Sequence, residues 1–268
     1  ATVQQSHLSD YVFTTELLTP ASRIGKLTMT PGISALSDKT LVPYVVVNGV
    51  QRIMKLSAMS DGQMHFIGDS SVNYSFKDNA KSFTDTAGHW AREAIDFVTA
   101  RELFGGTTEQ TFSPNATMTR GMIVTVLGRL ADAEAEGHAA RFSDVQPDAY
   151  YASYIGWAAD NGIVSGTGSQ RFEPDAPVTR EQLAVIMMNT LKHMELTLDN
   201  NEANPSTIAA YSDQDLVSSW ASVSANRLVA MGVLSGKSAH RLDPQGSATR
   251  AELATMLERM IEHTVAGQ

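Results

Sequence analysis

The sequence predicts an α+β protein in which a small β module precedes a mainly α-helical domain made of three copies of one motif. A strong hairpin signal lies within residues 1–80, helical periodicity begins at residue 81, and a Thr-Arg pair recurs at fixed places in the helical part. The predicted domains are residues 1–80 and 81–268. Within the second domain the three copies span residues 81–137, 138–200 and 208–265.

The β module is predicted from its turns. Asn48-Gly49 is a strong hairpin signal, because a type I′ turn needs positive φ at both central residues, and Asp61-Gly62 indicates a second reversal. We expect the module to be β-sandwich-like or to be the tail of an upstream region. The expected strands are Tyr11–Leu18, Leu27–Thr30, Tyr44–Val47, Val50–Ile53, Ile53–Ala58 and Met64–Ile67.

The helical part repeats itself with identical offsets. A glycine lies 14 residues before each Arg, Phe or Leu lies 8 before it, Pro lies 6 before it, and an aromatic residue lies 30 before it. An aromatic-x-Asp sequence lies further upstream in each copy. The recurring residues are Asp85, Asp144 and Asp213; Trp90, Tyr150 and Trp220; Gly106, Gly166 and Gly236; and Arg120, Arg180 and Arg250.

Each copy therefore predicts an Asp loop, a helix, a glycine loop and a second helix. Two short helices cannot bury both apolar faces alone, so the copies should pack together. Three copies around one axis predict a pseudo-threefold domain with grooves between neighbours. The spacing of the Arg residues grows from 60 to 70 at Leu198–Thr207, a polar stretch that indicates an inserted linker.

The Arg at the start of each second helix needs a physical reason. Thr is a preferred N-cap, and Gln182 and Glu252 can complete a capping box in copies two and three, whereas Met122 cannot in copy one. A cation in the first turn opposes the helix macrodipole, at a cost of roughly 0.3–1 kcal/mol. One possibility is that Arg and the free N–H groups form an anion site. The other is that each Arg pairs with a nearby Asp and holds one loop.

The composition argues against several classes of function. The formal net charge is −9, and residues 81–268 carry all of it with 14 Lys or Arg against 23 Asp or Glu, which disfavours nucleic acid as a partner. There is no Cys, and the seven His show no paired ligand spacing. No run reaches the ~18–20 apolar residues of a membrane span. We expect no metal, no cofactor and no membrane partner, and a signal peptide outside this fragment.

These residues resemble the S-layer homology (SLH) domain family. The likeness covers about residues 81–265 and rests on Phe83-x-Asp85, His89-Trp90, Gly106, Phe112-x-Pro114 and Thr119-Arg120, with their counterparts in the other copies. The resemblance implies a pseudo-threefold trimer of motifs at one end of a bacterial surface protein, in the cell wall or S-layer. It also implies non-covalent attachment to a secondary cell-wall polysaccharide, typically one bearing ketal-linked pyruvate.

The resemblance also implies a role for each recurring residue type. The arginines would hold the pyruvate carboxylate, the aspartates would accept hydrogen bonds from sugar hydroxyls or orient the arginines, the aromatic residues would form groove walls, and the glycines would let the backbone approach the sugar. The corresponding ligand-binding residues are Arg120, Arg180 and Arg250; Asp85, Asp144 and Asp213; Trp90, Tyr150 and Trp220; and Gly106, Gly166 and Gly236. Differences between the copies, such as Gly121-Met122 in copy one, predict grooves of unequal affinity.

Each of these residues could also have a purely structural role. The aspartates could cap a helix or pair with Arg, the Trp residues could belong to the core, and the glycines could provide positive φ at a helix end.

Three functional classes remain. The first is cell-wall anchoring through pyruvylated polysaccharide; the alternative is a protein-protein or self-assembly module of a surface layer. The third is an enzyme such as a glycosidase, which would need two carboxylates about 5–10 Å apart. The recurring acids single out no such pair, so we expect no enzymatic activity.

Overall fold

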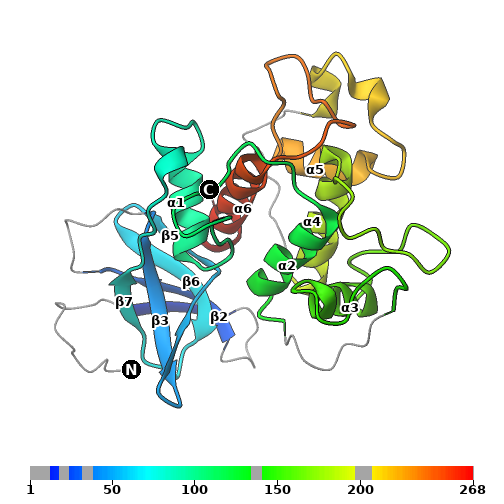
Figure 1. The fold of residues 1–268 in the computed structure, drawn as a ribbon. Helices are drawn as coiled ribbons and strands as arrows, with labels where there is room; N and C mark the ends of the chain where they lie inside the picture. Colours follow the sequence, from blue (N-terminus) through cyan, green and yellow to red (C-terminus); the bar gives the residue numbers. More distant parts are fainter. Residues whose placement is uncertain (1–12, 18–23, 32–38, 134–140, 197–206, 268) are drawn as a thin grey trace. The chain divides into compact units, whose positions relative to one another are not determined.

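The computed structural model describes residues 13–17, 24–31, 39–133, 141–196 and 207–267. Its strands and helices confirm the α+β class (Figure 1). The chain divides into two compact units, the first formed by residues 1–113 with 257–268 and the second by residues 114–256. The domain boundary predicted after residue 80 was placed where the repeats begin, and it does not coincide with the division into these two units. It stays a prediction.

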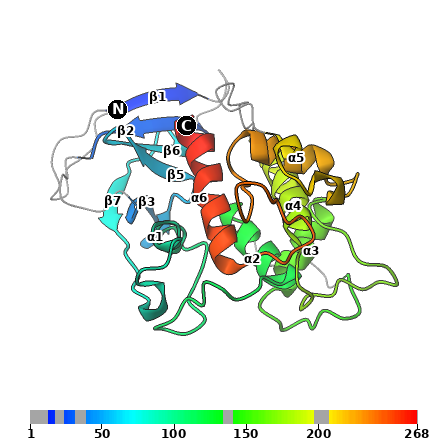
Figure 2. The same ribbon diagram turned by 90° about the horizontal axis from the view of Figure 1, so that it is seen from above.

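The strands of the first unit form two antiparallel sheets. The strand order is β1-β2-β6-β5 in one sheet, as Figure 2 shows, and β4-β3-β7 in the other. Leu27 and Phe66 from one sheet and Phe76 from the other lie in the same buried cluster, so the two sheets share a core. The bounds are β1 Phe13–Leu17, β2 Ile24–Met29, β3 Leu41–Val47, β4 Val50–Ile53, β5 Ser57–Ser60, β6 Gln63–Asp69 and β7 Ser75–Asp78.

Both turns that the sequence predicts are present. Asn48 and Gly49 have φ of 51° and 79° between β3 and β4, and Asp61 and Gly62 have φ of 50° and 74° between β5 and β6. The strand expected over residues 53–58 is different: β4 ends at Ile53, and β5 begins only at Ser57. The expected strand at residues 11–18 is found as β1, and its outermost residues lie outside the described ones.

Each copy contains two helices in the order that the repeats predict. Ala94, Ile95 and Val98 are buried along the first helix of copy one, and Ile123 and Leu127 are buried along the second. The predicted linker at residues 198–207 lies, except for Thr207, outside the described residues. The helices are α1 Arg92–Ala100, α2 Arg120–Leu130, α3 Ala152–Asp160, α4 Arg180–His193, α5 Ser222–Ala230 and α6 Arg250–Ala266, with short 3-10 turns at Thr84–Thr86, Ile208–Ala210 and Gln214–Leu216.

A closed ring of backbone hydrogen bonds joins the three copies within the second unit. The N–H of Met118 donates to the carbonyl of Ala248 (2.8 Å), that of Ala248 donates to Val178 (3.0 Å), and that of Val178 donates to Met118 (3.1 Å). All three side chains are fully buried, and each residue lies two positions before the Arg of its copy. The repetition in the sequence thus becomes a threefold pattern of contacts at the starts of α2, α4 and α6.

Candidate functional site

The first N–H groups of the second helices are occupied by the protein itself. The N–H of Arg120 donates to the carbonyl of Ala176, and the N–H of Arg180 donates to that of Gly246, both at 3.0 Å. The next N–H in each helix also donates to a carbonyl of the following copy, and the third donates to the Thr N-cap. These donors are therefore not available to an anion, and an anion at these places would have to bind a side chain instead.

The side chains of Arg120 and Arg180 make the same two contacts with the following copy. Arg120 donates from Nε to the carbonyl of Phe172 and from Nη2 to that of Ser165, both at 2.8 Å. Arg180 donates from Nε to the carbonyl of Leu242 at 3.0 Å and from Nη2 to that of Ser235. Carbonyl oxygens carry partial negative charge, which explains why a cation is tolerated at this end of a helix.

The recurring Asp residues hold the loop that receives these arginines. Asp144 accepts hydrogen bonds from the N–H groups of Phe172 (2.8 Å) and Glu173 (2.9 Å). Glu173 has φ of 58°, a left-handed conformation that costs a non-glycine residue energy. Phe172 is therefore held on both sides, because its N–H donates to Asp144 and its carbonyl accepts from Arg120.

The other two Asp residues act in the same way. Asp213 accepts from Leu242 and Asp243, each at 2.8 Å, and Asp85 accepts from Phe112 (2.8 Å) and Ser113 (2.7 Å). The second donor again has φ of 58° in each copy. The direct Arg–Asp pair considered from the sequence is not the contact described at Arg120 or Arg180; the Asp orients the carbonyl to which the Arg donates.

The recurring glycines are required by close packing and not by positive φ. A Cβ at Gly106 would lie 2.7 Å from the ring of Phe83, one at Gly166 would lie 2.7 Å from the ring of Phe142, and Gly236 faces Tyr211 in the same way. Positive φ occurs instead four residues earlier, at Gly162 (66°), at Gly232 (71°) and at Glu102 (58°). The residue with positive φ at the helix end, which is Glu102 in copy one and glycine in the other two, is thus distinct from the recurring glycine.

The recurring aromatic residues lie on the surface. Trp90, Tyr150 and Trp220 are 66%, 60% and 57% exposed. Large aromatic side chains are seldom left so open, and these occupy equivalent places in three copies. The core position considered for the two Trp residues is therefore wrong.

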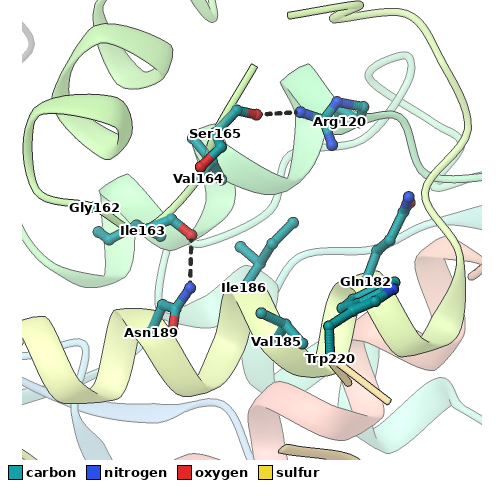
Figure 3. A pocket seen from close by; sticks show the side chains of 10 residues that line it. All are labelled: Arg120, Gly162, Ile163, Val164, Ser165, Gln182, Val185, Ile186, Asn189 and Trp220. Carbon is teal, nitrogen blue, oxygen red and sulfur yellow. Dashed lines mark hydrogen bonds between the residues drawn. The ribbon is translucent and has the colours of Figure 1, made fainter. Parts of the chain in front are cut away.

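A pocket of about 250 Å³ in the second unit brings residues of all three copies together (Figure 3). Of the predicted site residues, Arg120 and Trp220 line it. Trp220 comes from copy three, Arg120 from copy one, and the floor belongs to copy two. The complete lining is Arg120, Gly162, Ile163, Val164, Ser165, Gln182, Val185, Ile186, Asn189 and Trp220.

Two polar residues of this pocket were missed by sequence reasoning. Gln182 and Asn189 lie seven residues apart on α4, a spacing that places both on one face of a helix. Asn189 donates from Nδ2 to the carbonyl of Ile163 at 3.1 Å, which fixes its amide (Figure 3). The spacing alone could have predicted that Gln182 and Asn189 share a helix face, but only the fold shows that this face lies beside Arg120.

We expect the Asp–backbone contacts to make the protein sensitive to acid. Burial alone would raise the pKa of Asp144, but the N–H groups of Phe172 and Glu173 and the charge of Arg171 outweigh it and lower the pKa; the same holds for Asp213. A carboxylate with a lowered folded-state pKa stabilises the protein above its unfolded value of 3.8, and that stability is lost as the pH falls through the folded value.

The check is the thermal unfolding midpoint measured from about pH 5 to about pH 2. The double variant Asp144→Asn, Asp213→Asn should start lower and fall less with pH than the parent, because the two groups no longer titrate. Equal pH dependence of the parent and the variant would contradict this assignment.

The three copies match the S-layer homology domain over residues 82–121, 141–184 and 210–254. The chain belongs to this family. The confirmed motifs explain why the Asp loop, the aromatic residue, the glycine and the Thr-Arg pair recur together.

Similar proteins carry SLH regions within much longer chains. The chain is 29% identical over 203 residues to an amylopullulanase of Thermoanaerobacterium thermosulfurigenes, covering 76% of this chain and 11% of the relative. It is 28% identical over 177 residues to the surface-layer 125 kDa protein of Lysinibacillus sphaericus, covering 65% of this chain and 14% of the relative. An S-layer protein of Bacillus thuringiensis subsp. finitimus is 26% identical over 181 residues, which are 67% of this chain and 21% of that protein.

The SLH domain is a cell-wall-binding module, and the chain is a cell-surface, cell-wall-associated protein. No helix among the described residues is long and apolar enough to cross a membrane. Within the same residues no group of three or more His, Asp or Glu side chains could hold a metal ion.

Proposed function

We propose that this chain anchors its parent protein to the cell wall by binding a pyruvylated secondary cell-wall polysaccharide in the pocket beside Arg120. The proposal rests on the surroundings of the Arg120 guanidinium. This group lines an open pocket, and no carboxylate among the described residues forms a salt bridge with it. Burial lowers the pKa of Arg120, opposed by Glu173 and Asp144 at longer range, and the group remains a cation at neutral pH.

The remaining walls suit a sugar. Trp220 offers an exposed aromatic face on which a pyranose ring can stack, and Gln182 and Asn189 offer amide groups to hydroxyl or acetamido substituents. The carboxylate of a pyruvate ketal would accept hydrogen bonds from Arg120. Trp90 and Tyr150 are exposed in the same way and are proposed as platforms in the other grooves, with Arg250 as a further carboxylate contact.

In this proposal the Asp and Gly residues contribute indirectly. Asp85, Asp144 and Asp213 hold the loops, and Gly106, Gly166 and Gly236 let those loops pack on the aromatic ring upstream. Several weak sites on one chain, or on a surface lattice, would add up to firm attachment through effective concentration.

The enzyme class receives no support from the recurring acids. Each of these Asp residues places both carboxylate oxygens on backbone N–H groups of its own copy, so none is placed as a general acid or base. Any catalytic activity of the parent protein would lie in other domains. The self-assembly alternative rests on the exposed apolar side chains Leu216 and Val223, which lie near Trp220 in the sequence of copy three.

Replacing Arg120 tests the proposal. Arg120→Ala should weaken binding of purified pyruvylated wall polysaccharide by about 10- to 100-fold, because a hydrogen bond to a charged group contributes about 1.5–3 kcal/mol. Isothermal titration with native and depyruvylated polysaccharide measures the effect, which should vanish with the depyruvylated material.

Arg92→Ala is the matched control. Arg92 is 62% exposed and pairs only at 3.8 Å with Asp96 on its own helix, so its removal takes away the same charge without touching the pocket. Equal affinity of the Arg120→Ala variant and the parent for the native polysaccharide would contradict the proposed function.

A further inference from the structure

Arg120 and Arg180 differ in one hydrogen-bonding group. Both use Nε and Nη2 on carbonyls of the following copy. Nη1 of Arg180 donates to Oε1 of Glu252 at 3.0 Å, and the Arg180 side chain is only 4% exposed. Among the residues that the structure describes, no acceptor is found for Nη1 of Arg120, which lines the open pocket.

The difference comes from one position of the repeat. Gln182 and Glu252 both lie two residues after the Arg of their copy, and each completes a capping box. The N–H of Thr179 donates to Oε1 of Gln182 at 3.0 Å, and the N–H of Thr249 donates to Oε2 of Glu252 at 2.8 Å. One oxygen of each side chain is therefore engaged in the same way.

The other terminal atom of this side chain is an acceptor in Glu252 but a donor in Gln182. In Glu252 it is a carboxylate oxygen, which accepts from Arg180 and also pairs with Lys237 at 3.2 Å. In Gln182 it is an amide nitrogen, which can only donate. The Arg120 pocket thus has two donor groups on its walls, the Arg120 guanidinium and the Gln182 amide (Figure 3). The junction at Arg180 has an internal ion pair instead.

We propose that the residue at this position decides whether the Arg of the preceding copy is open to an acidic ligand. Gln182 leaves Arg120 open, and the two donors together bind the carboxylate of a carboxylate-bearing sugar. Glu252 closes Arg180, which acts as an internal clamp between copies two and three and not as a ligand-binding residue. This inference rests on the proposed function and adds a specificity-determining residue to it.

The decisive variant is Gln182→Glu. Glutamate preserves the capping box, as Thr249 and Glu252 demonstrate, and places a carboxylate oxygen where it can pair with Arg120. Its affinity for native wall polysaccharide, measured by isothermal titration, should fall at least tenfold, to the level of Arg120→Ala. Circular dichroism and the thermal midpoint show whether the fold is retained.

Gln182→Met provides the comparison, since Met122 occupies the equivalent position in copy one. This variant removes the amide without adding a charge, so its affinity should fall less than fivefold. Polysaccharide treated with mild acid, which removes a pyruvate ketal but not a uronic acid, identifies the source of the carboxylate: binding lost on treatment indicates the ketal, and binding retained indicates a uronic acid.

The outcomes separate the two proposals. If Arg120→Ala weakens binding and Gln182→Glu does not, the inference about position 182 fails and the proposed function stands. The inference also fails if Gln182→Met weakens binding as much as Gln182→Glu does, because charge would then not be the cause. If neither Arg120→Ala nor Gln182→Glu weakens binding, the proposed function itself fails.

Discussion

Arg180→Ala should lower the free energy of unfolding by about 3–5 kcal/mol, the usual effect of removing one partner from a buried ion pair. The guanidinium makes one contact with each of three parts of copy three: the carbonyl of Leu242, the carbonyl of Ser235 and the carboxylate of Glu252. Its side chain is 4% exposed, so water cannot replace these contacts without opening the junction.

Urea unfolding followed by circular dichroism measures this effect. Arg120→Ala is the matched comparison, because Arg120 makes the equivalent carbonyl contacts but has no Glu partner among the described residues and lies half-buried beside an open pocket. We expect the Arg120 variant to lose clearly less stability. Similar losses in the two variants would show that the ion pair with Glu252 contributes little.

Arg101→Met should destabilise the first unit by roughly 3 kcal/mol, since buried carbonyls left without a donor cost about 1–3 kcal/mol each. Arg101 follows the last residue of α1 and is fully buried. It donates from Nε to the carbonyl of Ser57 (2.7 Å) and from Nη1 to those of Lys39 (2.9 Å) and Phe97 (3.1 Å). Its guanidinium also stacks on the ring of Phe97, 3.4 Å from the ring centre.

Burial lowers the pKa of Arg101 to about 9, against the opposing effect of Glu258 and Glu262. The group still carries its charge at neutral pH, so its removal takes away a cation together with the contacts to Ser57 of β5 and to Lys39, just before β3. Met is a suitable replacement because Met231 occupies the equivalent helix end in copy three and is buried there. A loss below about 1 kcal/mol in urea unfolding at pH 7 would show that the β strands and α1 do not depend on this side chain.

The buried role of Arg101 could not be predicted from the sequence. Its repeat equivalents are Asn161 and Met231, which gives no pattern, and a lone Arg at a helix end is ordinarily a solvent-exposed residue favoured by the macrodipole. Only the fold brings Ser57 and Lys39, far away in the sequence, onto its donors. A contact between non-repeated segments leaves no offset in the sequence by which it could be predicted.

Local features were predicted well because they depend on nearby residues. Asn48-Gly49 and Asp61-Gly62 form the expected turns, and Thr179 and Thr249 form the expected capping boxes. The positive φ considered for the recurring glycines is wrong, because none of the three has it. Gly106, Gly166 and Gly236 are required by aromatic rings 23 to 25 residues upstream, and local conformational preferences do not reveal contacts over such a separation.

By itself, the sequence determined the α+β class, the three copies, their helices and the family, since identical offsets in three places are the mark of one repeated structural unit. The tertiary structure alone decided how the equivalent arginines differ. Arg120 and Arg180 occupy the same place in the repeat, but Arg120 lines an open pocket together with Gln182 of the next copy, whereas Arg180 forms an ion pair with Glu252 of the next copy. The physical reason is that charge compensation depends on which groups meet in space, and these pairs lie 62 and 72 residues apart in the chain.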